Sequence, residues 1–210
     1  YWGINFGVNS IYVFIINMIH VITYATHSHG TFDKLINNEF NIPVQVLGWN
    51  TEWRGFNDKF IGVYKYIKTL PADAIVLFVD GFDSVFNKNI DVIEKRFLEM
   101  NSKVVFSLDH ESRMARHVFG TCIGNNRANT GLYIGYVEYL KPILKKVLQL
   151  KCTDDQVKIN SVCKDFPYIS IDTDNYLFLN IIHGFNKDKL KNTCIVQYPG
   201  KTSLQRYIRG

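Results

Sequence analysis

The 210-residue sequence is poor in cysteine and lacks the patterns through which cysteine usually marks a function. Its four cysteines, Cys122, Cys152, Cys163 and Cys194, form no C-x-x-C pair, and no histidine stands at a zinc-like spacing from them. We therefore expect buried free thiols, with a Cys152–Cys163 bridge as the alternative. The absence of N-x-S/T sequons and of a signal-peptide pattern favours an intracellular site over the secretory pathway.

Two further absences limit the partners of the chain. The net charge is +5 at pH 7, but no long run of one sign, zinc-finger spacing or helix-turn-helix signal occurs, so we expect no nucleic-acid partner. The apolar stretch Ile11–Ala25 is interrupted by Asn17 and His20, which makes it too short and too polar for a membrane span. We treat residues 1–18 as an N-terminal extension of undefined role, whose aromatic side chains are the candidate surface for a homodimer.

Residues 19–210 carry the pattern of one α/β domain with a mostly parallel sheet flanked by helices. Hydrophobic residues make up 47% of the chain, which is enough for a sizeable core. Short β-branched runs alternate with segments of helical periodicity, which is typical of this class. The expected strands cover residues 19–25, 44–47, 74–79, 103–107, 132–137, 168–171 and 193–196. The expected helices cover residues 31–40, 57–68, 90–100, 138–150 and 154–162.

The most buried expected strand, residues 74–79, ends directly in two carboxylates, Asp80 and Asp83. Ligands of open α/β sheets bind beyond the carboxyl ends of the strands. Two carboxylates on one tight turn can hold a hard divalent cation that keeps positions open for phosphate oxygens. No G-x-G-x-x-G and no P-loop occurs, so a metal-held diphosphate is the expected ligand. The alternative is that Asp83 caps the following turn and Asp80 is solvated.

Eight short segments stand in a diagnostic order: Val21–Thr26, Leu47–Gly55, Gly55–Lys59, Phe78–Asp83, Val105–Ser107, Asn129–Gly131, Asp154–Gln156 and Pro199–Ser203. Together they resemble the GT-A glycosyltransferase domain of the multifunctional procollagen lysyl hydroxylases and the related collagen glucosyltransferases of giant viruses. The resemblance covers about residues 19–205 and implies a GT-A-like, Rossmann-like fold.

The resemblance also implies roles for individual residues. Asp80 and Asp83 would hold Mn²⁺, or Mg²⁺ in its place, which would bridge the two phosphates of a UDP-sugar. Asp154 and Asp155 would be the catalytic carboxylates that line the sugar and acceptor pocket. The implied substrate-binding residues are Thr26, Trp53, Lys59, Phe82, Asn129, Gln156, Gly200 and Lys201.

Two departures from the family pattern stand out. The closing loop of the family usually supplies a histidine as third metal ligand, and Gln197 stands there instead. An amide oxygen ligates Mn²⁺ more weakly than an imidazole does. The aromatic gating segment of the lysyl hydroxylases is replaced by Asp109–Arg113, so acceptor handling is expected to differ.

Several of these residues also have structural interpretations. Asp154 and Asp155 could be the N-cap and first turn of a helix, an interpretation that the spacing alone favours and the resemblance reverses. The loop with His27 and His29 is expected to be solvated, with metal binding as its alternative. Asp172 is expected in a surface turn.

The resemblance implies a retaining glycosyltransferase that moves glucose from UDP-glucose to galactosyl-hydroxylysine in collagen or a collagen-like protein. Transfer from UDP-galactose to hydroxylysine is the nearest alternative. An inactive UDP-sugar-binding module is the other, and Gln197 is the residue that favours it.

Overall fold

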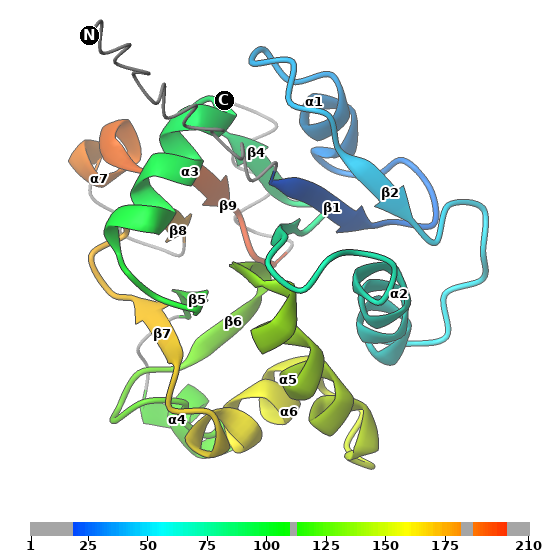
Figure 1. Cartoon of the computed structure of the whole chain (residues 1–210), viewed down its shortest axis with the longest axis vertical. Coiled ribbons are helices and arrows are strands. Elements are labelled where there is room, and N and C mark those ends of the chain that lie inside the picture. Colours follow the sequence, from blue (N-terminus) through cyan, green and yellow to red (C-terminus); the bar gives the residue numbers. More distant parts are fainter. Residues whose placement is uncertain (1–18, 110–112, 182–186, 201–210) are drawn as a thin grey trace, which may run out of the picture.

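The computed structural model describes residues 19–109, 113–181 and 187–200. Its centre is a six-stranded sheet in the order β2-β1-β3-β6-β5-β7 (Figure 1). The strands are β1 (His20–Tyr24), β2 (Gln45–Leu47), β3 (Ile75–Val79), β5 (Val104–Leu108), β6 (Ala128–Tyr136) and β7 (Ile169–Asp172). Only β6 runs against its neighbours, which confirms the expected mostly parallel sheet.

A second sheet of three strands has the order β4-β9-β8 and contains β4 (Ser84–Phe86), β8 (Phe178–Asn180) and β9 (Ile195–Gln197). β4 starts one residue after Asp83 and pairs antiparallel with β9, so that Ser84 faces Gln197. This pairing brings a residue 114 positions away in the sequence next to the turn that ends β3.

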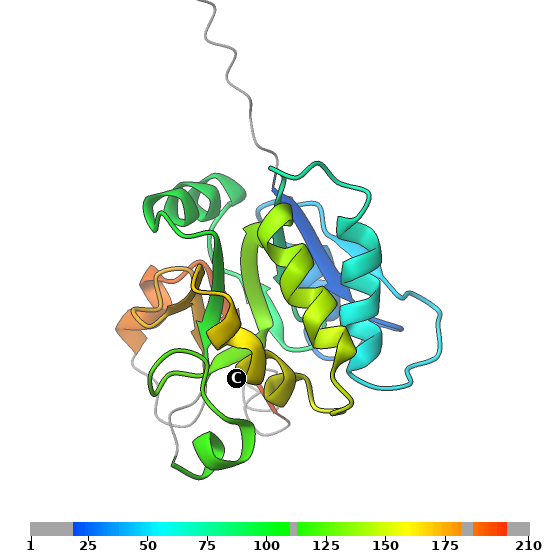
Figure 2. The same cartoon turned by 60° about the horizontal axis from the view of Figure 1, so that its bottom comes forward.

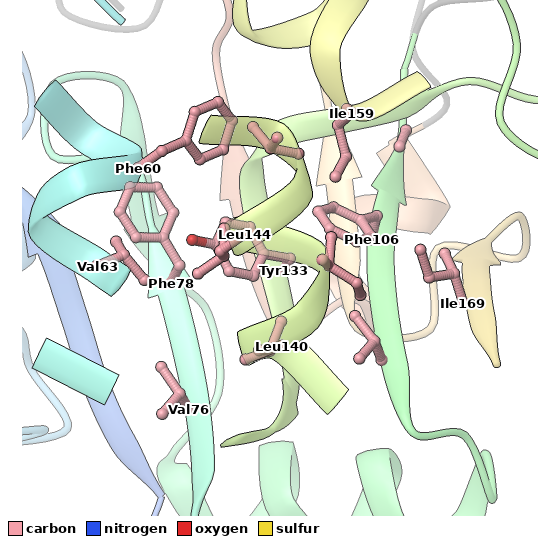
Figure 3. Close-up of a cluster of buried hydrophobic side chains, with 14 of the residues drawn as sticks. Phe60, Val63, Val76, Phe78, Phe106, Tyr133, Leu140, Leu144, Ile159 and Ile169 are labelled. Carbon is pink, nitrogen blue, oxygen red and sulfur yellow. The ribbon is translucent and has the colours of Figure 1, made fainter. Parts of the chain in front are cut away.

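Helices cover both faces of the central sheet, as Figures 1 and 2 show. The described helices are α1 (Phe32–Ile36), α2 (Asn57–Ile67), α3 (Ile90–Glu99), α4 (Arg113–Phe119), α5 (Val137–Gln149), α6 (Asp155–Val162), the 3₁₀ turn η1 (Cys163–Asp165) and α7 (Lys187–Asn192). α2, α5 and α6 pack on one face, where Phe78, Phe106 and Tyr133 form the centre of a buried cluster (Figure 3). α1, α3 and the small sheet enclose the cluster on the other face. Among the described residues, no helix has the length and hydropathy needed to cross a bilayer.

Two expectations about local structure were wrong. The helix expected over residues 31–40 ends at Ile36, because the Asn38 side chain binds the backbone of Leu35 and Ile42 and closes a turn there. Asp172 is buried and does not lie in a surface turn. Its carboxylate accepts the backbone N–H groups of Tyr176, Leu177 and Phe178, which organises the turn into β8.

The expectation of free thiols at all four cysteines was also wrong. Cys122 and Cys163 form a disulfide with a Cα–Cα distance of 5.0 Å, whereas Cys152 and Cys194 are free. The bridge joins the segment that leads into β6 to the end of α6. Sequence spacing could not indicate this pairing, because the two cysteines meet only once β6 and α6 are packed together.

Candidate functional site

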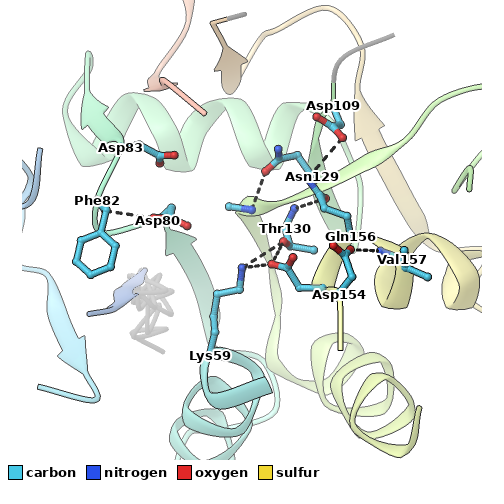
Figure 4. A network of polar contacts seen from close by, with 12 residues as sticks. Lys59, Asp80, Phe82, Asp83, Asp109, Asn129, Thr130, Asp154, Gln156 and Val157 are labelled. Carbon is cyan, nitrogen blue, oxygen red and sulfur yellow. Dashed lines mark hydrogen bonds and ion pairs between the residues drawn. The ribbon is translucent and has the colours of Figure 1, made fainter. Parts of the chain in front are cut away.

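Many of the predicted site residues gather where the carboxyl ends of β1, β3 and β5 meet the start of β6 and the N-terminus of α6. Figure 4 shows Asp80, Asp83 and Phe82 on one side of this polar edge, and Lys59, Thr130, Asp154 and Gln156 on the other. The antiparallel direction of β6 explains the meeting, because its first residues lie beside the last residues of β3 and β5. Residues from five separate chain segments therefore share one site.

Asp80 and Asp83 occupy a turn that is fixed by backbone hydrogen bonds. The Asp80 N–H donates to the Gly131 carbonyl at 2.8 Å, and Asp80 Oδ1 accepts the Phe82 N–H at 3.1 Å. The Tyr198 N–H donates to the Asp83 carbonyl at 2.8 Å. Burial raises the pKa of both carboxyls, and the charge of Asp80 raises the pKa of Asp83 further. Keeping both carboxylates ionised in this turn therefore costs free energy. A cation bound between them would compensate their charges, as a metal site requires.

Gln197 lies beside this turn and is buried. Its Nε2 donates to Asp83 Oδ1 at 3.0 Å, and its Oε1 is a buried oxygen that has no hydrogen-bond partner in the part of the chain that the structure describes. A buried acceptor without a partner is costly, and a bound cation would satisfy it. The donor set of Asp80, Asp83 and Gln197 therefore fits a hard divalent cation. No group of three His, Cys, Asp or Glu residues that could hold a metal occurs in the described ranges, and the Gln197 amide is the further protein oxygen beside the two carboxylates.

Gly131, the last residue of the Asn129–Gly131 segment, makes room for that amide. A Cβ built on Gly131 would lie 2.2 Å from Gln197 Nε2 and 2.6 Å from its Oε1. The Gly131 N–H is held in turn by Asn129 Oδ1 at 2.7 Å. Asn129 and Gly131 thus shape the wall of the site.

Lys59 and Asp155 form a buried ion pair on the other side of the edge. The ammonium group of Lys59 in α2 donates to Asp155 Oδ2 and, at 3.2 Å, to Thr130 Oγ1, whose hydroxyl also donates to Asp155. Burial alone would raise the pKa of Asp155, but the charge of Lys59 and these hydrogen bonds hold that pKa below its ordinary value. Asp155 is therefore kept ionised, and Lys59 already has a carboxylate partner.

Asp154 and Gln156 flank Asp155 at the start of α6. Asp154 is the N-cap of α6, because its Oδ1 accepts the Val157 N–H at 2.9 Å. This is the capping role that the spacing alone favours. Gln156 Oε1 accepts the Thr130 N–H at 3.2 Å, and its Nε2 lies 3.5 Å from Asp109 Oδ2. The helix N-terminus thus aims polar side chains at the start of β6.

Sequence reasoning missed Arg127, which is buried and forms an ion pair with Asp109. The pair fixes the end of β5 against the start of β6. Arg127 Nε and Nη1 are buried and have no hydrogen-bond partner among the described residues. No motif marked Arg127, and only its pairing with the strand end that carries Asp109 connects it with the site.

Two of the expected nucleotide-binding residues, Thr26 and Phe82, lie in the loops that follow β1 and β3. The Phe82 ring contacts the exposed imidazoles of His27 and His29 at centroid distances of 5.4 and 5.8 Å. The Thr31 N–H donates to the Phe82 carbonyl at 2.9 Å and holds that loop against the Asp80–Asp83 turn. Thr26 Oγ1 lies 2.9 Å from His27 Nδ1.

Trp53 is 46% exposed and contacts the Tyr24 ring at 5.9 Å. It also contacts the Phe56 ring at 5.8 Å, and it therefore stands apart from the contacts around Phe82. Gly200 has φ +81, a conformation that glycine adopts without strain. Lys201 and the N-terminal extension 1–18 lie outside the described residues.

The fold of this chain is that of the GT-A glycosyltransferases. A solved glycosyltransferase involved in the glycosylation of the major capsid of PBCV-1 is 12% identical, with a TM-score of 0.61 over 91% of this chain and 97% of that chain. The galactosyltransferase LgtC, solved with donor and acceptor sugar analogues, is 10% identical, with a TM-score of 0.56 over 91% of this chain and 94% of that chain. These likenesses concern the fold.

The chain belongs to the family described as the PLOD GT domain, whose model matches residues 16–194. Procollagen-lysine,2-oxoglutarate 5-dioxygenase 2 of Mus musculus is 30% identical over 161 residues, which are 69% of this chain and 22% of that protein. The multifunctional procollagen lysine hydroxylase and glycosyltransferase of Caenorhabditis elegans is 27% identical over 154 residues, 65% of this chain and 20% of that protein. The chain thus spans about a fifth of the length of these curated relatives.

Proposed function

We propose that this chain is a divalent-cation-dependent retaining glycosyltransferase that moves glucose from UDP-glucose to galactosyl-hydroxylysine in collagen or a collagen-like protein. The observation that carries the proposal is the trio of the half-buried Asp80 and Asp83 and the buried Gln197, with raised carboxyl pKa values and an amide oxygen that has no hydrogen-bond partner among the described residues. Family membership supports the reaction class, and the similarity to a procollagen lysine hydroxylase and glycosyltransferase supports a procollagen substrate. The catalytic unit would be residues 19–210.

In this reaction one group of residues would hold the cation and another would bind the nucleoside. Asp80, Asp83 and Gln197 would hold Mn²⁺ or Mg²⁺, which supplies charge neutralisation for the UDP leaving group. Phe82, Thr26 and Trp53 would bind the nucleoside through ring faces and a hydroxyl.

On the sugar side, Asn129 and Gln156 would orient hydroxyls at the start of β6. Asp155 is held ionised by Lys59, so it would act as a fixed negative charge beside the sugar and not as a proton donor. One oxygen of Asp154 caps α6, and the other oxygen would be the one available to the sugar or the acceptor. Lys59 and Lys201 would contact the phosphates or the donor sugar.

A donor panel tests the proposal. UDP release is measured with UDP-glucose and UDP-galactose in the presence of Mn²⁺, with and without a peptide that carries galactosyl-hydroxylysine. We expect UDP-glucose turnover that the peptide stimulates and that Asp80→Ala abolishes, while Asp91→Ala, an exposed carboxylate in α3, leaves it unchanged. Turnover of UDP-galactose on unmodified hydroxylysine would replace the reaction and keep the site.

An inactive UDP-sugar-binding module is the second candidate, since Gln197 stands where the family usually has a histidine. UDP binding without turnover of either donor would favour it over the enzyme. Dimerisation through residues 1–18 stays a prediction. The Cys122–Cys163 disulfide favours folding in an oxidising compartment, in contrast with the intracellular site expected from the sequence.

A further inference from the structure

The orientation of the Gln197 amide follows from the chemistry of its neighbour. The amide nitrogen faces Asp83, because Nε2 donates to Asp83 Oδ1 at 3.0 Å and an amide oxygen could only accept. The carbonyl oxygen is then the atom left for another ligand, and it is buried with no hydrogen-bond partner among residues 19–109, 113–181 and 187–200. The atom that Gln197 can offer a cation is therefore an oxygen.

The backbone fixes this position. Gln197 is the last residue of β9, which pairs with β4 on one side and β8 on the other. Its carbonyl accepts the Ile181 N–H at 2.8 Å, and the next residue, Tyr198, donates to the Asp83 carbonyl at 2.8 Å. The absent side chain of Gly131 leaves the space in which the amide lies. Strand register, and not a mobile loop, sets Gln197 beside the two carboxylates.

We propose that Gln197 makes the cation site of this chain an all-oxygen site, which accepts Mg²⁺ nearly as well as Mn²⁺ and gains little from borderline cations such as Co²⁺. The inference rests on the proposed cation-dependent function and specifies the ion class. Carboxylate, carbonyl and water ligands suit Mg²⁺, Ca²⁺ and Mn²⁺, whereas imidazole raises affinity for later transition metals. The imidazoles of His27 and His29 contact the Phe82 ring and belong to no three-ligand group in the described residues.

Metal binding alone tests this inference, without turnover. Mn²⁺ is titrated into the full chain by electron paramagnetic resonance, and Mg²⁺ or Co²⁺ is used to displace it. We expect Gln197→His to raise the preference for Co²⁺ over Mg²⁺ by about tenfold or more relative to the unmodified chain. Gln149→His, at the exposed end of α5, is the matched control and should leave this preference unchanged.

Two further variants keep the test decisive if the histidine is not tolerated. Gln197→Met preserves length and removes the oxygen, so Mn²⁺ affinity should fall by about tenfold. Gly131→Ala places a Cβ where the amide lies and should produce the same loss while Gln197 is still present. Thermal melts report whether each variant is folded.

The results separate this inference from the proposed function. A preference for Co²⁺ that Gln197→His leaves unchanged, or Mn²⁺ affinity that Gln197→Met leaves intact, would overturn the inference even if glucose transfer occurs. The expected ion preference in a chain that transfers no sugar would uphold the inference and refute the proposed function.

Discussion

Removing the Lys59 ammonium should destabilise the chain strongly, and the loss should depend on pH. Lys59 is 6% exposed, and its ammonium group is the cation that compensates Asp155, which is also 6% exposed. Breaking a buried ion pair from one side typically costs about 3–5 kcal/mol, because the remaining charge is buried without compensation. For Lys59→Met we expect a loss in this range at pH 7, or a fall in Tm of about 10 °C for a chain of this length.

The sign of the pH dependence follows from the pKa of Asp155. In the unmodified chain this pKa is lowered, so the carboxylate stabilises the fold at neutral pH, and that contribution is lost as the pH falls through the lowered pKa. In Lys59→Met burial remains without the ammonium group and raises the pKa above its ordinary value. The variant then loses stability as the pH rises from about 4 towards its raised pKa, so its deficit should be larger at pH 7 than at pH 4.

Urea unfolding at pH 7 and pH 4 measures both effects. Lys95→Met is the matched control, because Lys95 forms an exposed pair with Glu99 at 3.9 Å, and such pairs contribute about 0–1 kcal/mol. The double variant Lys59→Met with Asp155→Leu should recover much of the loss, since no charge remains buried alone. A cost below about 1 kcal/mol for Lys59→Met, or a deficit that grows at pH 4, would refute the account of this pair.

Three other outcomes follow from the structure. Cys122→Ser should cost about 4 kcal/mol in urea unfolding, since the bridge closes a loop of 41 residues, whereas Cys152→Ser should be neutral. Because the pKa values of Asp80 and Asp83 are raised, stability from these groups is lost as the pH rises, so Mn²⁺ should raise Tm more at pH 7 than at pH 5. Asp172→Ala should cost about 3 kcal/mol by calorimetry, because three backbone donors lose their acceptor; a loss below 1 kcal/mol would contradict that role.

The sequence predicted those parts of the molecule that depend on local patterns. The buried run Ile75–Val79 defined β3, and its abrupt end in Asp80 and Asp83 located the polar edge. The alternation of strand and helix patterns predicted the α/β class, because a two-sided buried strand and an amphipathic helix differ in periodicity. The family resemblance contributed the remaining site residues, and the role of each of them stays a prediction.

Most of the missed features depend on contacts between distant segments, and one depends on backbone donors that no spacing signals. The Cys122–Cys163 bridge and the Arg127–Asp109 pair require β5, β6 and α6 to be packed together, and neither leaves a local spacing signal. Asp172 looks like a turn residue in the sequence, yet it collects three N–H groups from the segment that follows it. Lys59 was expected to meet phosphate because the resemblance implied it, whereas its partnership with Asp155 is a matter of tertiary packing.

The central claim is that the edge formed by Asp80, Asp83 and Gln197 holds a nucleoside diphosphate through a divalent cation. Isothermal titration of UDP into the full chain, with Mn²⁺ and then with excess chelator, tests it most directly. The account predicts binding with Mn²⁺, its loss with chelator, and its loss in Asp83→Asn with Mn²⁺ present. UDP affinity that is equal with and without the cation, or unchanged in Asp83→Asn, would contradict the account.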